Sequence, residues 1–173
     1  KLISKKQAIL RIDPNSLDAL LHPTLDEKSS IKVIANGLPA SPGAVSGKVV
    51  FTSEEAERLN DMMQDTILVR VETSPEDIQG MHAAKGILTS RGGMTSHAAV
   101  VARGMGRPCV SGSSEIDINY EKKIFKTSSG EVKEGDIITI DGSSGRIILG
   151  NVPTVKPEIS GDFSKLMNWA DNI

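Results

Sequence analysis

Residues 91–109 read Arg-Gly-Gly-Met-Thr-Ser-His-Ala-Ala-Val-Val-Ala-Arg-Gly-Met-Gly-Arg-Pro-Cys. The two leading glycines permit a tight turn. Thr95 is suited to cap a helix, because its hydroxyl can accept a hydrogen bond from an amide one turn ahead. We therefore expect a short helix that carries His97 in its first turn and ends where Gly104 takes the left-handed conformation. The free amides and the positive dipole at the start of such a helix would stabilise an anion beside the imidazole.

A histidine beside an anion site is suited to phosphoryl relay. Neutral imidazole is a nucleophile, and an ordinary pKa near ~6.5 leaves much of it unprotonated at neutral pH. Attack on a phosphoryl donor would give an N-phosphorylated histidine, whose P–N bond keeps a high transfer potential. The alternative is a binding or structural module in which His97 only caps or packs against the helix start. The residues by themselves leave both readings open.

Three blocks of the sequence resemble the swivelling domain of the phosphoenolpyruvate-utilising enzymes. Residues 92–108 resemble the phosphohistidine signature of that family. The block Pro39-Ala-Ser-Pro-Gly-Ala-Val-Ser-Gly47 resembles the segment that opens the domain, and residues 134–145 resemble the segment that closes it. The resemblance covers roughly residues 33–150 and is closest to the dikinases of the family.

The resemblance implies a fold and a set of partners. The family's swivelling domain is a compact α/β domain with β/β/α layers, and it carries a phosphoryl group between an ATP-grasp nucleotide domain and a C-terminal (β/α)8 barrel that handles pyruvate and phosphoenolpyruvate. We accordingly expect residues 1–32 to be a helical linker from the nucleotide domain and residues 33–150 to be the swivelling domain. Residues 151–173 would be a linker and the start of the barrel domain.

The resemblance also implies the roles of individual residues. His97 would form the tele-phosphohistidine intermediate, on the way from ATP, phosphate and pyruvate to AMP, pyrophosphate and phosphoenolpyruvate. The side chains and amides that would hold its phosphoryl oxygens are Gly92, Gly93, Thr95 and Ser96, with Arg91 and Arg103 flanking them. The family's phosphoenolpyruvate synthases and the first enzyme of the sugar phosphotransferase system stay as alternatives.

Cofactors and partners follow from the same resemblance. Mg²⁺ and a monovalent cation would belong to the partner domains, and we expect no metal or cofactor in this chain. Because it carries neither a nucleotide site nor a pyruvate site, we do not expect it to turn over alone. The full-length protein would be a homodimer.

Thr95 has a second expected role. In some dikinases of the family, a bifunctional regulatory kinase/phosphatase phosphorylates the threonine two residues before the histidine, and the enzyme is inactivated. Thr95 occupies that position. A dianion there would repel an incoming phosphoryl group and occupy the same amides.

The periodicity of apolar residues predicts short strands that alternate with short helices. We expect strands over residues 44–51, 66–71, 86–89, 136–141 and 146–149, with helices that start near Thr52 and Ser74. Met62 and Met63 are expected in the core. The apolar face of a last helix (Phe163, Leu166, Met167 and Trp169) has no obvious home in this chain and is expected to pack on the next domain.

Composition excludes several classes of function. The chain has 173 residues, a net charge of -2 and only 3% aromatic residues, so neither a basic footprint nor stacking platforms for nucleic acid are expected. A single cysteine, Cys109, excludes an internal disulfide, and we expect a buried, inert thiol. Asp141 is interpreted as a turn residue and not as a metal ligand. Without a signal peptide or an apolar run of ~18 residues, we expect no membrane contact and a cytoplasmic protein.

Overall fold

The apolar runs of the sequence form one mixed sheet in the computed structural model of the chain, which describes residues 2–157 and 161–172. In order across the sheet the strands are β2 (Val33–Asn36), β12 (Arg146–Leu149), β11 (Ile137–Asp141), β4 (Ala44–Val50), β5 (Thr66–Arg70), β6 (Gly86–Thr89), β7 (Cys109–Ser111) and β3 (Leu38–Ser41). Strands β4 to β7 are parallel to one another, and the remaining pairs are antiparallel. The expected strands are thereby confirmed.

This sheet curls until its two edges meet. The edge strands β2 and β3 follow each other in the sequence with only Gly37 between them. The Gly37 amide donates to the carbonyl of Gly145 at 2.8 Å, and a Cβ on Gly37 would lie 2.7 Å from Val110 Cγ1. The parallel half of the sheet therefore lies over its antiparallel half.

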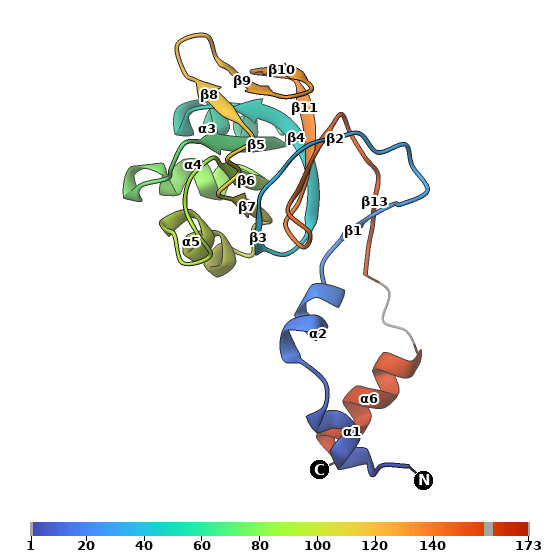
Figure 1. Cartoon of the computed structure of the whole chain (residues 1–173). Coiled ribbons are helices and arrows are strands. Elements are labelled where there is room, and N and C mark those ends of the chain that lie inside the picture. Colours follow the sequence, from blue (N-terminus) through green and yellow to red (C-terminus); the bar gives the residue numbers. More distant parts are fainter. Residues whose placement is uncertain (1, 158–160, 173) are drawn as a thin grey trace.

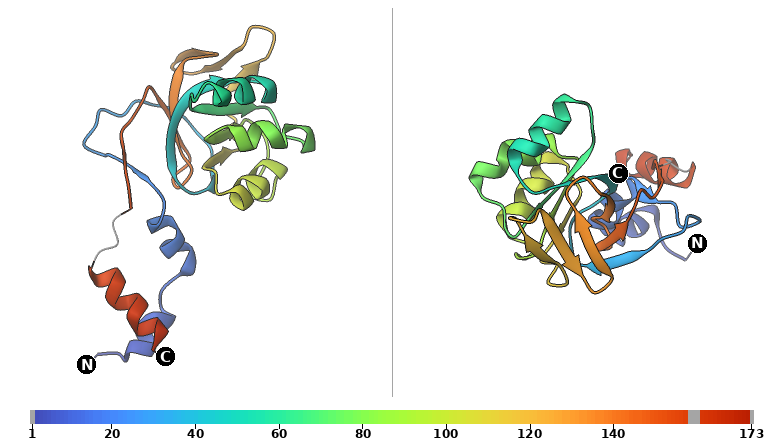
Figure 2. Two further views of the ribbon diagram at one scale, coloured as in Figure 1. Left: turned by 180° about the vertical axis from the view of Figure 1, so that it is seen from behind. Right: turned by 90° about the horizontal axis from the view of Figure 1, so that it is seen from above.

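Helices cover the outer face of the parallel strands and complete three layers. They are α3 (Ser53–Asp61), α4 (Ile78–Ala83), which follows the 3-10 turn η1 (Pro75–Asp77), and α5 (His97–Met105), and they lie together on one side of the sheet (Figure 2). One core cluster lies between these helices and the sheet, and a second lies inside the curl. The expected α/β fold with β/β/α layers is confirmed.

Alternate side chains of β5 belong to the two core clusters. Ile67 and Val69 point into the curl, and Leu68 points toward the helices; all three are fully buried. A strand buried on both faces has a continuous apolar sequence, as parallel strands with two covered faces do.

The elements from β2 to β12 make up the body of the molecule. A small antiparallel sheet stands at the end of this body that lies away from the two chain termini (Figure 1). Its strands are β8 (Asp117–Asn119), β9 (Ile124–Thr127) and β10 (Gly130–Lys133). Phe125 and Val132 are buried against the cluster inside the curl, so this sheet closes one end of the body.

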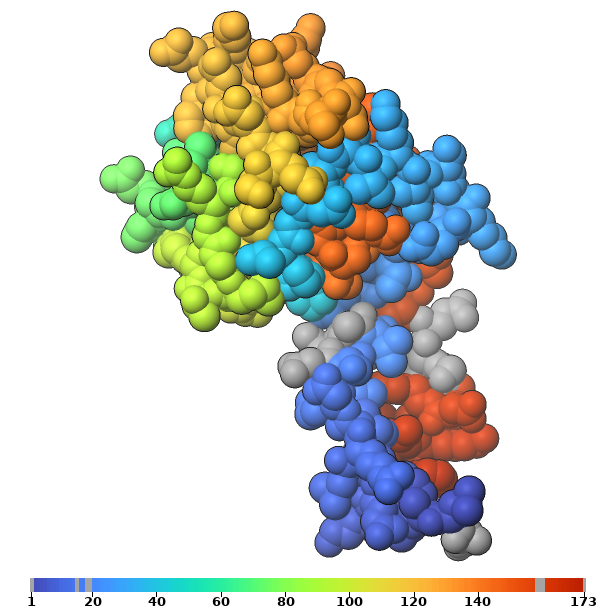
Figure 3. Space-filling model, viewed as in Figure 1, coloured from blue at the N-terminus to red at the C-terminus, as the bar shows by residue number. Residues whose placement is uncertain are grey.

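The segments on either side of the body form a narrow stalk (Figure 3). Helices α1 (Lys5–Leu10) and α2 (Pro14–Leu20) precede the body, and α6 (Gly161–Asp171) follows it. At the junction β1 (Thr24–Leu25) pairs antiparallel with β13 (Thr154–Val155). Leu25 and Val152 are buried with Ala44 and Ile148. The segments that enter and leave the body are therefore both packed against it. The boundaries at residues 33 and 150 stay a prediction.

The expectation that Met62 and Met63 lie in the core is wrong. Helix α3 ends at Asp61 with Met62 as its C-cap, and Met63 has a φ of 58°. Both methionines leave the helix face, and they are 55% and 92% exposed. The last helix does contact this chain, because α6 packs against α1 and Lys5 Nζ lies 5.3 Å from the centre of the Trp169 ring. None of the described residues 161–171 is buried by this contact, so the packing of α6 on the next domain stays a prediction.

Two helical glycines differ sharply in their surroundings and supply a matched test of the packing. A Cβ on Gly80 in α4 would lie 2.5 Å from Ser53 Cα in α3, whereas a Cβ on Gly104 in α5 would meet nothing within 4 Å. Gly80→Ala should therefore lower the free energy of unfolding by about 1–3 kcal/mol through overpacking. Gly104→Ala should raise it by about 0.5–1 kcal/mol, because alanine has less backbone freedom to lose.

Urea unfolding of both variants, followed by circular dichroism, checks this pair. Shifts of the same sign would contradict the packing of α3 on α4.

Candidate active site

The histidine loop leaves the sheet at the edge where the parallel strands end. Residues 90–96 connect β6 to α5, and β5, β6 and β7 are parallel neighbours. The carboxyl ends of parallel strands lie at one edge of a sheet, where ligands tend to bind. The loop is tied to the preceding strands, because the Ser90 amide donates to Arg70 at 3.2 Å and the Arg91 amide donates to Val71 at 3.0 Å.

The two loop glycines, Gly92 and Gly93, differ in their backbone conformation and in their surroundings. Gly92 has a φ of +102°, and a Cβ there would lie 2.8 Å from Ser96 Cβ, so the turn itself requires glycine. A Cβ on Gly93 would meet nothing within 4 Å. Packing therefore gives no reason for a glycine at position 93, whereas the close approach of a ligand to the backbone would.

Ser96, and not Thr95, caps helix α5. The Ser96 backbone is extended (φ -63°, ψ 160°), and its hydroxyl accepts from the Ala99 amide at 3.3 Å. The Ser96 amide donates to the Gly93 carbonyl at 3.1 Å, which places Thr95 inside the preceding turn. The expectation that Thr95 is the N-cap is wrong. Its side chain is exposed instead.

The helix also ends two residues later than expected. Gly106, with a φ of 68°, is the left-handed C-cap, and its amide donates to the carbonyls of Ala102 and Arg103. Gly104 lies within the last turn of α5. The sequence Gly-Met-Gly offers two equivalent terminators, and the second is used.

His97 is held by a residue that the sequence analysis did not select. Thr73 Oγ1 and His97 Nδ1 are 2.9 Å apart, and Thr73 is only 9% exposed. Thr73 lies just beyond β5, and His97 lies beyond the neighbouring β6. The rule that ligands gather at the carboxyl edge of a parallel sheet could have drawn attention to the end of β5 as well.

This hydrogen bond has two possible directions with different chemical results. If Nδ1 carries the proton and donates to Thr73, the Nε2 lone pair is free to attack an electrophile. If the threonine hydroxyl donates to Nδ1, the proton lies on Nε2, which then cannot act as a nucleophile. Within the described residues Nε2 has no hydrogen-bond partner, and the His97 side chain is half-buried.

The start of α5 offers donors to an anion near the imidazole. The first amides of a helix have no acceptor within the helix. Ser96 satisfies those of Ala99 and Val100, through its hydroxyl and its carbonyl. In the described part of the chain, the amides of His97 and Ala98 have no such acceptor. The exposed Thr95 lies on the same turn.

The two flanking arginines differ. Arg103 donates from Nη1 to the Ala40 carbonyl at 2.8 Å and from Nη2 to the Met94 carbonyl at 2.7 Å. It therefore braces the histidine loop against β3. Arg91 is exposed. Contact of either side chain with a phosphoryl group stays a prediction.

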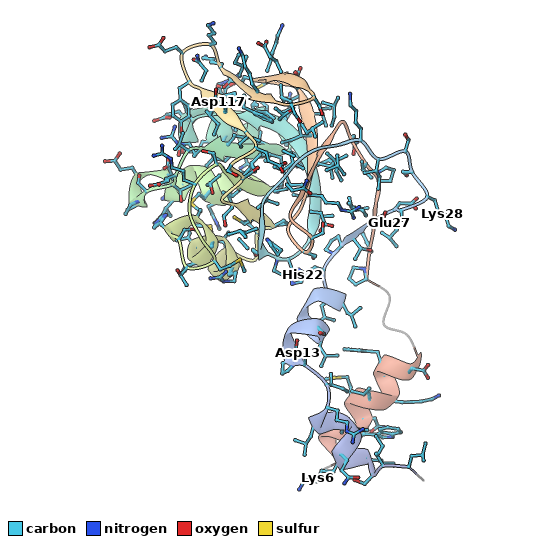
Figure 4. The ribbon with its side chains drawn as sticks, viewed as in Figure 1. Lys6, Asp13, His22, Glu27, Lys28 and Asp117 are labelled. Atoms are coloured by element: carbon cyan, nitrogen blue, oxygen red, sulfur yellow. The ribbon has the colours of Figure 1, made fainter. Side chains whose placement is uncertain are left out.

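The remaining candidates lie away from this site. His22 lies between α2 and the body (Figure 4), and His82 is exposed near the end of α4. Asp141 accepts hydrogen bonds from the Ser143 amide at 3.0 Å and the Ser144 hydroxyl at 2.6 Å. Its interpretation as a turn residue is confirmed.

Residues 2–157 and 161–172 contain neither a group of side chains suited to a metal ion nor a helix suited to span a membrane. Over these residues, no three histidine, cysteine or acidic side chains are grouped so that they could hold a metal ion. None of the helices there is long and apolar enough to cross a membrane.

Comparison with known proteins gives consistent relatives. Residues 62–145 match the family model described as "PEP-utilising enzyme, mobile domain". The chain is 59% identical over 170 residues to pyruvate, phosphate dikinase of Rhizobium meliloti, covering 98% of this chain and 19% of that protein. It is 56% identical over 173 residues to the Rickettsia typhi protein of the same name, covering 100% of this chain and 20% of the relative. The chain thus spans about a fifth of the length of these curated relatives.

A solution structure of Enzyme I is 27% identical to this chain. The likeness covers 65% of this chain and 40% of that one. Its TM-score of 0.38 is too low to indicate a shared fold by itself.

Cys109 lies in β7, packed with α5, and its environment predicts low reactivity. Burial raises the pKa of its thiol from 9.0 to about 12, and the charge of Arg103 opposes this rise only in part. At pH 8 a pKa of about 12 leaves only about one thiol in 10⁴ as the reactive thiolate. A disulfide reagent at pH 8 should react with the unfolded chain within minutes and with the folded chain only as fast as it opens.

The same shift predicts a stability effect. The unfolded thiol ionises above pH 9 and the folded thiol does not, so this contribution to stability is lost as the pH rises from 9.0 toward about 12. In Cys109→Ala the free energy of unfolding should therefore fall less steeply over this pH range than in the wild type. Fast labelling of the folded chain would contradict the burial of this thiol.

Proposed function

Because the chain belongs to the family of PEP-utilising enzyme mobile domains, we propose that it is the phosphohistidine carrier domain of a pyruvate, phosphate dikinase. The parent enzyme would convert ATP, phosphate and pyruvate to AMP, pyrophosphate and phosphoenolpyruvate. Both curated relatives described above carry the dikinase name, which favours this activity over that of a synthase or of the first enzyme of the sugar phosphotransferase system.

The hydrogen bond between Thr73 and Nδ1 of His97, at 2.9 Å, is the observation that carries this proposal. With the proton on Nδ1, the Nε2 lone pair forms a bond to the β-phosphorus of ATP while the bond to the leaving AMP oxygen breaks. The terminal phosphoryl group then passes to inorganic phosphate, and pyrophosphate is released. Finally the P–N bond breaks as the remaining phosphoryl group passes to the enolate oxygen of pyruvate, and Nε2 regains its lone pair.

The surroundings of His97 support a relay. The unpaired amides of His97 and Ala98 and the open backbone at Gly93 can receive phosphoryl oxygens. Thr95 and Ser96 hydroxyls lie on the same turn. Of the two flanking arginines, Arg91 is exposed, whereas Arg103 braces the loop.

Other parts of the parent protein complete the proposal. An ATP-grasp nucleotide domain and a phosphoenolpyruvate/pyruvate barrel of the same chain would supply and accept the phosphoryl group. They would also hold Mg²⁺ and a monovalent cation. We further propose a homodimeric parent enzyme in the cytoplasm.

The test of the relay uses the full-length protein with pyruvate and ATP labelled in the β-phosphate. Acid-labile label should appear on His97, and label should reach phosphoenolpyruvate only when inorganic phosphate is present. His97→Asn should reduce both signals to background and leave circular dichroism unchanged, because the amide cannot accept the phosphoryl group and the half-buried side chain contributes little packing.

The other outcomes are equally clear. Label in phosphoenolpyruvate without added phosphate would indicate a synthase. Full activity of His97→Asn would contradict the carrier role altogether.

We also propose that Thr95 is a regulatory phosphorylation site for a bifunctional kinase/phosphatase. Its side chain is exposed and makes no cap hydrogen bond, since Ser96 caps the helix. A phosphate there would bring negative charge to the amides that receive the transferred group.

A charge at position 95 should therefore inhibit transfer. Like charges ~5 Å apart repel by roughly 1–3 kcal/mol near a protein surface, so Thr95→Glu should slow turnover of the full-length enzyme by about tenfold. Thr95→Gln loses the same hydroxyl and has the same shape without the charge, so its turnover should be slowed much less than that of Thr95→Glu. Equal rates for the two variants would rule out the electrostatic mechanism.

A further inference from the structure

Thr73 lies in a short connection that has few supports. Residues 71–74 link the end of β5 to the turn η1. At the near end, Val71 donates its amide to the Tyr120 hydroxyl at 2.6 Å and accepts from the Arg91 amide at 3.0 Å. At the far end, the Ser74 amide donates to Asp77 Oδ2 at 2.9 Å.

The Tyr120 hydroxyl accepts the hydrogen bond that a neighbouring strand would otherwise accept from the Val71 amide. The pairing of β4 with β5 ends at Val50 and Leu68, so the Val71 amide lies beyond the last ladder partner on that side. A backbone amide without a strand partner takes another acceptor, either a side chain or water. Tyr120 supplies it from the turn that follows β8, in the small three-stranded sheet.

The Tyr120 ring is itself held in place. It stands edge-on to Phe51, with ring centroids 6.4 Å apart and an interplanar angle of 78°. The Arg70 guanidinium carbon lies 4.8 Å from the centre of the ring, and Arg70 donates to the Phe51 carbonyl at 2.9 Å. The hydroxyl is therefore presented to Val71 from a fixed platform, and the platform does not depend on the hydroxyl.

From these contacts we propose that Tyr120 is a positioning residue for His97. Its hydroxyl fixes Val71, which fixes the connection that carries Thr73, and Thr73 in turn holds Nδ1 of the imidazole. This inference rests on the proposed function, in which Nε2 is the nucleophile. The small sheet, which contributes no group to the histidine loop, thereby determines how well the imidazole is oriented.

The physical reason is the tautomer. Which ring nitrogen carries the proton depends on the hydrogen bond that the other ring nitrogen makes. An acceptor held at 2.9 Å from Nδ1 keeps the proton there. When the Val71 amide loses its acceptor, residues 71–74 relax, Thr73 leaves its position, and the tautomer with the proton on Nε2 gains population.

Tyr120→Phe tests the inference because it removes the hydroxyl and keeps the ring. The 173-residue chain labelled with ¹⁵N in its histidine rings has three histidines, and His97→Asn identifies the signals of His97. In the wild type, Nδ1 of His97 should be the protonated nitrogen. Tyr120→Phe should shift protonation toward Nε2, and Thr73→Val should produce a larger shift in the same direction.

The control and the rate complete the experiment. Thr127→Val also removes one hydroxyl from the small sheet, where in the described part of the chain it bonds within the β9–β10 turn, and should leave the tautomer unchanged. In the full-length protein, Tyr120→Phe should slow phosphorylation of His97 by ATP about fivefold, the factor that one neutral hydrogen bond is worth.

The outcomes separate this inference from the proposed function. An unchanged tautomer in Tyr120→Phe overturns the positioning role, whatever happens to the rate. So does an equal shift in Thr127→Val, which would mean a general loosening of the small sheet. No phosphorylation of wild-type His97 would overturn the proposed function, and the ring signals would still report whether Tyr120 orients the imidazole.

Discussion

The parallel pairing of β5 with β6 is the constraint on which the site depends. It sets the ends of the two strands side by side, with Arg70 opposite Thr89. Two residues 24 positions apart, Thr73 and His97, consequently meet in a hydrogen bond. Parallel strands need cover on both faces, and here the helices cover one face and the antiparallel half of the same sheet covers the other. The parallel pairing therefore requires the curl of the sheet, and it also sets the geometry at the imidazole.

Much of the fold could be predicted from the sequence because apolar runs report burial directly. The sequence predicts a buried strand over residues 86–89, and these residues form β6. Two of the details that the sequence predicts wrongly are choices between chemically equivalent neighbours. Thr95 and Ser96 can both cap a helix, and Gly104 and Gly106 can both end one, so the surrounding turns decided. Thr73 was missed for another reason: its role arises from strand pairing, and a single sequence does not show which segments pair.

The site combines a rigid frame with an open front. Arg103 braces the loop by two hydrogen bonds to backbone carbonyls, and Gly92 is packed against Ser96. Gly93 and Thr95 by contrast face open space or solvent. A carrier has to present the same geometry to two different partners, and preorganised donors meet that need without rearrangement at each encounter. Positioning by Tyr120 would extend the rigid frame to the far end of the body.

The pairing of β1 with β13 has a consequence for how such a domain spreads among proteins. Thr24 lies opposite Val155, so the chain enters and leaves the body at nearly the same point (Figure 1). A host protein that accommodates a domain of this kind has to open a gap only about two strands wide. The entropic cost of lengthening a surface loop rises slowly with its length. We therefore expect that the body can be inserted as one unit into an exposed turn of an unrelated protein. The fold of the body and the fold of the host should both change little.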